Sequence, residues 1–255
     1  MTGLADYPLL VLVLSFLVMW LSARFGLRCR KRRAELGDGV HQDLALIISA
    51  ALTLLGLIVG FSFSMAISRY DQRKSLEEAE ANAIGTEYLR ADLLPPADAA
   101  KVRALLGAYL DQRVLFYKSR DAKELEKINA DTAQLQTKLW SAVEAPAIAQ
   151  PSPVIALAAA GMNDVLNSQG YTQAAWWNRI PSGAWFLMIA VAICCNVLVG
   201  YDSRQDGARA VRLLVLPFVL CIAFFATADI DSPRRGVIRV RPQNLISLAQ
   251  SLHGQ

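Results

Sequence analysis

The chain has 255 residues, of which 54 % are apolar and 19 % charged, and its formal net charge is +4. Soluble domains usually contain roughly 45–50 % apolar and about 25 % charged residues, so this composition, with a mean hydropathy of +0.32, indicates a membrane protein. It argues against a soluble secreted enzyme, a disulfide scaffold and a disordered chain. The small positive charge is not typical of a nucleic-acid-binding protein.

Four apolar runs dominate the chain, at residues 8–23 (extendable to 27), 44–67, 181–201 and 211–228. About 20 apolar residues in a helix cross the roughly 30 Å of hydrocarbon in a bilayer. The sequence therefore predicts an all-α, multi-pass integral membrane protein of the plasma (inner) membrane. Its expected parts are a first helix pair (1–67), a helical insert (68–180), a second helix pair (181–228) and a tail (229–255).

The second membrane helix is expected to continue beyond the bilayer, because no proline occurs between Asp43 and Leu94. At 1.5 Å per residue its length would be roughly 75 Å. Small residues at 79–86, Gly85 among them, would let a neighbouring helix approach closely. Glu77, Glu78 and Glu80 are interpreted as a solvated face of this helix. Further helices are predicted at about 96–117, 122–143 and 154–177, with a linker at Ala145–Pro153.

Chemical motifs are scarce. There is no Gly-rich phosphate loop, Cys-x-x-Cys, His-x-x-x-His or Gly-x-Ser-x-Gly pattern. His41 and His253 are expected to be solvated, and Cys29, Cys194, Cys195 and Cys221 are expected to be reduced packing residues. The sequence thus predicts no enzyme, no catalytic residue, no metal and no cofactor. The middle of each membrane run lacks ionisable residues, which argues against active transport.

One face of the second membrane helix carries small and hydroxyl residues at spacings of three and four. Tight helix packing would explain this face. The alternative is a pore wall, where small side chains leave room for water and hydroxyls replace part of an ion's hydration shell. The predicted pore-lining residues are Ser49, Thr53, Gly56, Gly60, Phe61, Phe63 and Ser64.

Charged residues gather where membrane helices end. In one interpretation they anchor helix ends through salt bridges; in the other they surround a pore mouth. The predicted pore-mouth charges are Arg69, Arg73, Lys74, Asp229 and Asp231. The orientation stays open, because the short loops hold nine Lys or Arg and the flanks on the other side hold eight.

The stretch from Gly60 to Lys74 (GFSFSMAISRYDQRK), continuing through Glu80 to Pro95, resembles a family of uncharacterised bacterial membrane proteins with a bestrophin-like domain. True bestrophins are pentameric anion channels whose second membrane helix lines the pore. The resemblance implies a similar order of helix pairs around an insert, followed here by Asp229-Ile-Asp-Ser-Pro233. Because Pro-Arg-Arg-Gly replaces the usual Pro-Phe-Gly and the acidic calcium clasp is incomplete, calcium gating is not expected.

Two functions follow from these observations. The first is an oligomeric ion channel, with passive anion conduction along the second membrane helix. The second is a non-conducting scaffold or sensor that binds a partner through its helical insert. The expected partners are the lipid bilayer, further copies of the chain (a pentamer by analogy) and ions, without nucleic acid.

Overall fold

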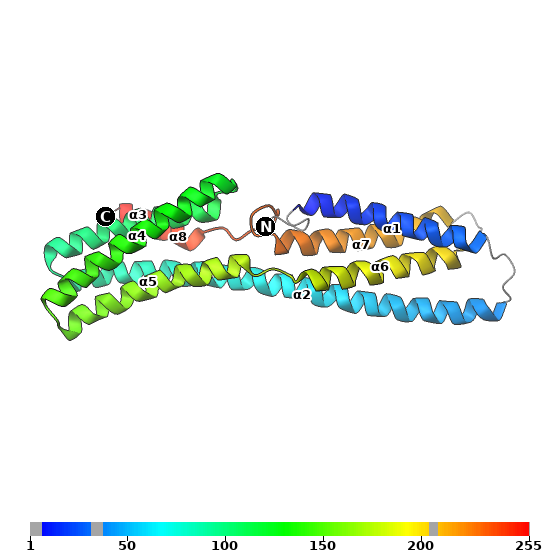
Figure 1. The fold of residues 1–255 in the computed structure, drawn as a ribbon, viewed down its shortest axis with the longest axis horizontal. Coiled ribbons are helices and arrows are strands. Elements are labelled where there is room, and N and C mark those ends of the chain that lie inside the picture. The colour runs from blue at the N-terminus through cyan, green and yellow to red at the C-terminus, as the bar shows by residue number, and fades with distance from the viewer. Residues whose placement is uncertain (1–6, 32–37, 204–208, 255) are drawn as a thin grey trace. The chain divides into compact units, whose positions relative to one another are not determined.

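The protein was analysed as a computed structural model, which describes residues 7–31, 38–203 and 209–254, with backbone only for 30–31, 38–42, 209–210 and 212. All regular elements in these ranges are helical. The chain is an all-α membrane protein. Its elements are α1 (Pro8–Lys31), α2 (Asp38–Arg90), the short 3₁₀ helix η2 (Ala91–Leu93), α3 (Pro96–Lys118), α4 (Ala122–Ala149), α5 (Pro153–Trp177), α6 (Ser182–Asp202), α7 (Arg209–Asp231) and α8 (Gln243–His253) (Figure 1).

The chain divides into two compact units. Unit 1 comprises residues 1–69 and 179–239, and unit 2 comprises residues 70–178 and 240–255. The predicted insert corresponds closely to the first segment of unit 2. The predicted tail, in contrast, is shared, because residues 229–239 belong to unit 1 and the remainder belongs to unit 2.

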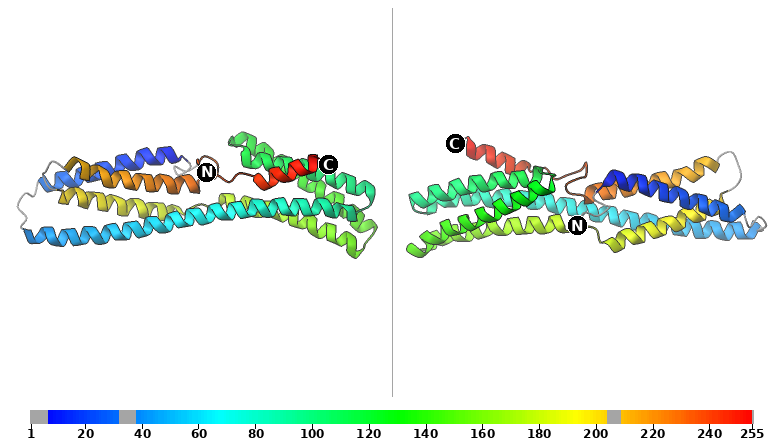
Figure 2. Two further views of the ribbon diagram at one scale, coloured as in Figure 1. Left: turned by 180° about the vertical axis from the view of Figure 1, so that it is seen from behind. Right: turned by 45° about the horizontal axis from the view of Figure 1, so that its top comes forward.

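In unit 1 the helices α1, α6 and α7 and the first part of α2 run alongside one another (Figure 2). They share an apolar core that includes Met19 of α1, Leu55 of α2, Met188 of α6 and Phe224 of α7. The candidate membrane spans, by length and composition, are Pro8–Cys29, Asp43–Leu93, Pro153–Asp202 and Leu213–Asp231. Four helices are therefore long and apolar enough to cross a bilayer, as predicted.

Helices α1 and α6 approach each other closely at two glycines of unit 1. A β-carbon on Gly200 would overlap the carbonyl of Ala23, and one on Gly26 would overlap the carbonyl of Val197. Glycine is required at both positions, because the colliding atoms belong to backbone and cannot turn away. Small residues of this kind allow helices to pack closely in a membrane, where the hydrophobic effect drives helices together only weakly.

Unit 2 is a helical bundle built from the second part of α2 with α3, α4, α5 and α8. Local sequence sets its helix ends: Pro96 begins α3, the Asp121 carboxylate accepts the first amides of α4, and Ser152 caps α5 ahead of Pro153. Proline at the first helical position and Asp or Ser at the N-cap are both favourable. The predicted start of the helix at Pro96 is confirmed.

One prediction for the helices of unit 2 is wrong. The expected linker at Ala145–Pro153 is mostly helix, because α4 continues through Pro146 to Ala149 and only residues 150–152 separate it from α5. Pro146 lies in the last turns of α4, where its missing N–H costs a single helical hydrogen bond. No secondary structure was predicted for the tail, and the structure shows the helix α8 there.

Candidate functional site

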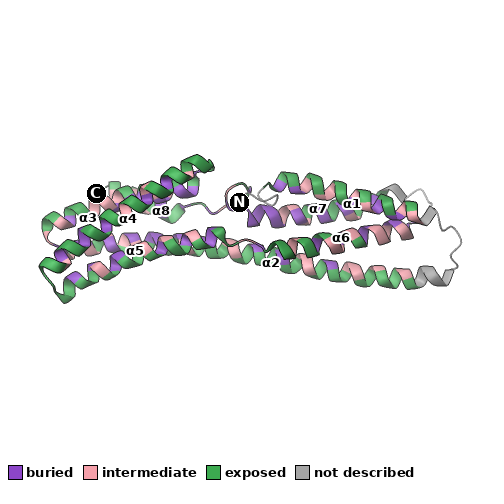
Figure 3. Cartoon of the chain, viewed as in Figure 1, coloured by how far each residue is buried: buried purple, intermediate pink, exposed green. Residues whose placement is uncertain are grey.

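The predicted pore-lining residues form an open face on α2. All seven are exposed, including Phe61 at 65 % and Phe63 at 36 % (Figure 3). The opposite side of the same helix carries the buried residues Leu55, Ser62 and Ala66. The side of α2 with Leu55 and Ala66 therefore packs into unit 1, and the rest of the helix surface, with the small and hydroxyl residues but also large apolar ones such as Leu54, is left uncovered by it.

Gly56 and Gly60 show how open this face is. A β-carbon at either position would have no heavy atom of the described chain within 4 Å. Tight packing within one chain therefore does not explain the Gly-x-x-x-Gly pair, in contrast to Gly26 and Gly200, which do pack against backbone. None of the described residues outside α2 covers this face at the two glycines.

The hydroxyl groups on this face already donate hydrogen bonds to their own helix. Ser49 Oγ donates to the Leu46 carbonyl at 2.8 Å, and Thr53 Oγ1 donates to the Ser49 carbonyl at 2.8 Å. At 100° per residue, Phe63 lies about 60° from Gly60 around the helix axis and Phe61 about 100° away on the other side. Phe63 thus borders the small-residue face, and Phe61 lies farther from it.

At one end of unit 1, Asp231 joins three segments that are distant in sequence. Both of its carboxylate oxygens accept the Ile180 amide at 3.2 Å, just before α6. Arg69 on α2 lies 3.8 Å away and Arg179 lies 3.5 Å away. This predicted pore-mouth residue therefore ties the last turn of α7 to α2 and to the start of α6.

The neighbouring Asp229 binds backbone amides instead of arginine side chains. Its oxygens accept the amides of Val237 at 2.7 Å and Ile238 at 2.9 Å, which fixes the turn that follows α7. Within the described ranges, no three His, Cys, Asp or Glu residues gather closely enough to hold a metal ion. The two carboxylates thus organise backbone and arginine side chains.

The predicted basic residues at the mouth differ in their surroundings. Arg69 is largely buried beside Asp231, and Arg73 is buried in unit 2, where its Nε donates to the Ala175 carbonyl at 3.4 Å. Lys74 is exposed, and so are the acidic Asp71 and Glu78 on the same stretch of helix. One copy therefore exposes charges of both signs in this region.

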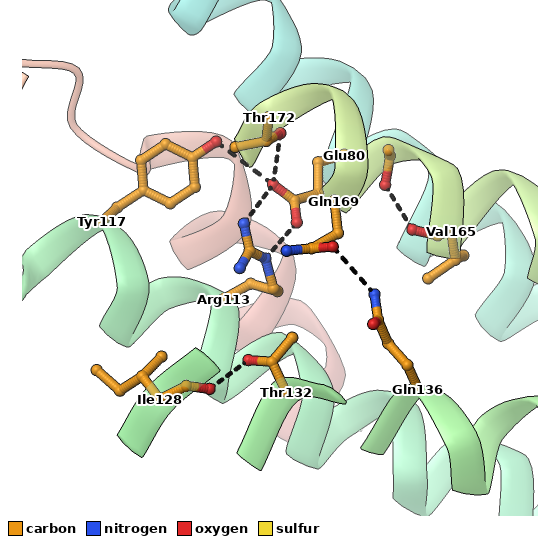
Figure 4. Close-up of polar contacts among 10 residues, drawn as sticks. Glu80, Arg113, Tyr117, Ile128, Thr132, Gln136, Val165, Gln169 and Thr172 are labelled. Atoms are coloured by element: carbon orange, nitrogen blue, oxygen red, sulfur yellow. Dashed lines mark hydrogen bonds and ion pairs between the residues drawn. The ribbon is translucent and has the colours of Figure 1, made fainter. Parts of the chain in front are cut away.

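The interpretation of Glu77 and Glu80 as solvated is wrong, because both are buried, and only Glu78 of the three is exposed. Glu80 lies at the centre of the polar core of unit 2 (Figure 4). It forms an ion pair with the fully buried Arg113 of α3. It also accepts hydrogen bonds from Tyr117 at 3.3 Å and Thr172 at 3.2 Å.

Aromatic rings enclose this ion pair. The Arg113 guanidinium carbon lies 4.4 Å from the centroid of Phe116, and Phe116 and Tyr117 both meet Trp176 edge to face. Burial, reinforced by the Glu80 charge, raises the pKa of the Tyr117 phenol, so Tyr117 remains a hydrogen-bond donor at neutral pH. Sequence reasoning missed this network because its partners are on α3 and α5, far from Glu80 in sequence.

Glu77 anchors α8. Its carboxylate accepts the Leu245 amide at 3.0 Å and the Asn244 side chain at 2.7 Å, at the beginning of that helix. Gly85, farther along α2, would place a β-carbon 3.2 Å from Leu248. The expectation that small residues here admit a neighbouring helix is confirmed, and that helix is α8. A groove of about 440 Å³ remains between α2 and α8.

Glu87 is a third buried acid of α2. It is fully buried, and neither carboxylate oxygen has a hydrogen-bond partner among the described residues. Its side chain lies against Gly161 of α5, beside the Arg90 guanidinium. Burial raises its pKa to about 8, with Arg90 opposing and Asp164 reinforcing the shift. The carboxyl group is therefore protonated at neutral pH.

This raised pKa predicts that the protein becomes less stable as the pH rises from about 5 to 8. Over this window the folded state keeps a proton that the unfolded state, with a carboxyl pKa of 4.5, releases, so folding is favoured at the acidic end and loses a few kcal/mol by the alkaline end. The Glu87→Gln variant should lack this decline and melt at the higher temperature at pH 8.5. Melting temperatures of the full chain across this pH range test it, with the exposed Glu78→Gln as control. A parallel decline in Glu87→Gln would contradict it.

Comparison with known proteins agrees with this architecture. A crystal structure of a bacterial Bestrophin homolog from Klebsiella pneumoniae matches with a TM-score of 0.65 at 13 % identity, covering 95 % of this chain and 97 % of that one. A mutant of that homolog matches with a TM-score of 0.64 at 13 % identity, covering 96 % and 99 %. A structure described as a membrane protein matches with a TM-score of 0.65 at 12 % identity, covering 95 % and 97 %. At such identities the likeness establishes the fold.

No protein of curated function matches the chain. The family model for the Bestrophin-like domain, however, matches residues 9–245, which includes all four membrane helices and the helical insert. The open face of α2, the Asp231 junction and the buried core of unit 2 all lie within this match. The chain belongs to the Bestrophin-like domain family.

Proposed function

We propose that the protein is an oligomeric ion channel in which α2 of each copy lines a shared pore. The observation that carries this proposal is the uncovered face of α2, where a β-carbon on Gly56 or Gly60 would meet none of the described residues beyond their own helical turn within 4 Å. Side chains such as Met19, Leu55 and Phe224 fill the space between the helices of unit 1. A pore must therefore lie between copies, and a homo-oligomer is required.

The absence of charged residues from this face favours passive conduction over active transport. Residues 44–67 contain no Asp, Glu, Lys or Arg, so nothing on the pore wall would carry a proton or bind an ion tightly. The Ser49 and Thr53 hydroxyls donate their protons to their own helix, so this face would offer a hydrated anion space between small side chains, and Phe63 would narrow the edge of the path. By resemblance to bestrophins we propose chloride as the main ion and five copies as the assembly.

The charges at residues 71–78, near a pore mouth, have both signs. They do not fix the ion selectivity, which therefore has to be measured. Lys74 would attract anions, whereas Asp71 and Glu78 would oppose it. Chloride and potassium fluxes through purified protein in liposomes give the ratio directly. A ratio that favours potassium would overturn the proposed anion preference and leave the channel itself standing.

The pore assignment predicts that bulky substitutions on the open face stop conduction. Gly60→Leu and Ser49→Trp should reduce flux to the background of empty liposomes, because each adds a large side chain where the chain itself leaves space. Gly183→Leu is the matched control: Gly183 on α6 also has nothing within 4 Å, and this variant should conduct normally. Unchanged flux in both α2 variants would remove α2 from the pore.

The alternative function is a scaffold or sensor that binds a partner through unit 2. The groove between α2 and α8, lined on both sides by Asn, Ser and Thr side chains as well as by apolar ones, is the feature that favours it. Absence of flux from folded, oligomeric protein, together with capture of one stoichiometric partner that Asn82→Trp releases, would favour this function over conduction.

A further inference from the structure

The turn that follows α7 presents a combination of side chains that ion conduction does not use. Val237 is 80 % exposed and Ile238 is 47 % exposed. Arg235, two residues earlier, is exposed as well. Two branched aliphatic side chains and a guanidinium thus stand on the surface immediately after the span Leu213–Asp231, where a membrane helix meets the headgroup region.

Backbone contacts hold this turn in place. The Asp229 carboxylate accepts the amides of Val237 at 2.7 Å and Ile238 at 2.9 Å. Gly236 packs against the Asp229 carbonyl so closely that a β-carbon would overlap it. The Val237 and Ile238 backbone is therefore fixed while the side chains remain outside, so their exposure belongs to an ordered structure.

Tyr7 marks the same boundary from a second helix. The Arg235 guanidinium carbon lies 4.2 Å from the centroid of the Tyr7 ring, and Tyr7 directly precedes α1 and is 46 % exposed. Tyrosine is enriched where membrane helices enter the headgroup layer. The start of α1 and the turn after α7 thus bring an aromatic ring and a cation together, two residues before the exposed Val237.

Arginine side chains are concentrated in this part of the chain. Three arginines lie in or directly after the turn: Arg234, Arg235 and Arg239. The two nearby acids do not neutralise Arg235 by contact, because Asp229 accepts backbone amides and Asp231 lies with Arg69, Arg179 and the Ile180 amide. Basic side chains at a membrane surface attract anionic headgroups, and adjacent apolar side chains enter the acyl boundary.

We propose that the turn at residues 233–238 is a binding site for anionic phospholipid, in which Arg235 contacts the headgroup phosphate and Val237 and Ile238 insert between the upper acyl chains. Tyr7 positions the guanidinium, and Asp229 holds the backbone that directs the two aliphatic side chains outward. The site depends on membrane insertion and is independent of whether the protein conducts ions.

Lipid titration of the full-length protein in neutral detergent tests this site. Phosphatidylglycerol should raise the melting temperature more than phosphatidylcholine does, and Arg235→Gln should require about fivefold more phosphatidylglycerol for half of the effect. Arg120→Gln, which removes an exposed arginine of unit 2, should behave like the unaltered protein. Inorganic phosphate should have no effect, because it lacks the acyl chains.

Two further variants separate the components of the site. Arg235→Lys should retain most of the response to phosphatidylglycerol, and Val237→Ser should weaken the response to both lipids; either variant serves if Arg235→Gln does not fold. An equal response to both lipids, or an unchanged response in Arg235→Gln, would overturn the proposal. Equal stabilisation by inorganic phosphate would indicate a site for free anions instead of a phospholipid site. If Val237 is buried only in the oligomer, the turn at residues 233–238 is a contact between copies.

Discussion

The Glu80→Ala variant is expected to lose about 3–5 kcal/mol of unfolding free energy, because Arg113 would remain buried without its counter-charge. Both members of this pair are fully buried. The substitution would also leave the Tyr117 and Thr172 hydroxyls without their shared acceptor. Thermal unfolding of the full chain, followed by the fluorescence of Trp176 and the other tryptophans, should show a melting temperature about 10 °C lower or more.

A second variant distinguishes a lost partner from lost packing. Glu80→Met combined with Arg113→Met replaces the pair by apolar side chains of similar length, and such replacements of buried ion pairs are often neutral or stabilising. The double variant should therefore recover at least half of the loss. Glu78→Ala, on the exposed side of the same helix, should change stability by no more than about 0.5 kcal/mol. If Glu80→Ala melts like Glu78→Ala, the ion pair does not stabilise unit 2.

Enlarging Gly200 is expected to disrupt unit 1. Gly200→Ala should cost about 1–3 kcal/mol, and Gly200→Leu should cost more, because even a β-carbon overlaps the Ala23 carbonyl across the α1–α6 crossing. Side-chain rotation cannot relieve a collision with backbone, so the two helices must separate along their contact. Melting of the detergent-solubilised full chain, read by Trp20 and Trp185, measures the loss.

Gly183→Ala and Gly183→Leu are matched controls in the same helix, since Gly183 has no described neighbour within 4 Å. Both should change the melting temperature little. Equal effects at positions 183 and 200 would mean that the variants act through helix propensity, which is the same for a glycine at either position, and that the α1–α6 contact contributes nothing measurable.

The sequence predicted the helices well wherever one local pattern dominated. Three local signals agreed with the tertiary contacts. They are the charge-free runs near 20 residues long, the absence of proline between Asp43 and Leu94, and Pro96 at a helix start. The end of α4 was missed because proline normally ends a helix, yet Pro146 is accommodated in the final turns. Helix α8 was not predicted, although Leu245, Leu248, Ala249 and Leu252 follow a helical spacing and pack in or against the core of unit 2.

The main error in the sequence-based prediction was to leave Glu77 and Glu80 exposed. The contacts that bury them come from residues distant in sequence. Alone, Glu77 and Glu80 look like other surface acids of a helix; what buries them is an arginine on α3 and the beginning of α8. Nothing in a window around Glu80 indicates Arg113. Likewise, Gly26 and Gly200 are single glycines without a motif and do pack closely, whereas the conspicuous pair at Gly56 and Gly60 contacts nothing in its own chain.

The pairing of α1 with α6 also constrains how the protein can be made. Gly26 meets Val197, about 170 residues later in the chain, and synthesis at 5–20 residues per second separates the two by roughly 10–30 s. During that interval α1 has entered the bilayer without the helix that covers its glycine groove. The α1–α6 contact therefore forms last among the contacts of α1 with the helices up to α6, and a substitution at Gly26 acts on a step that comes late in assembly.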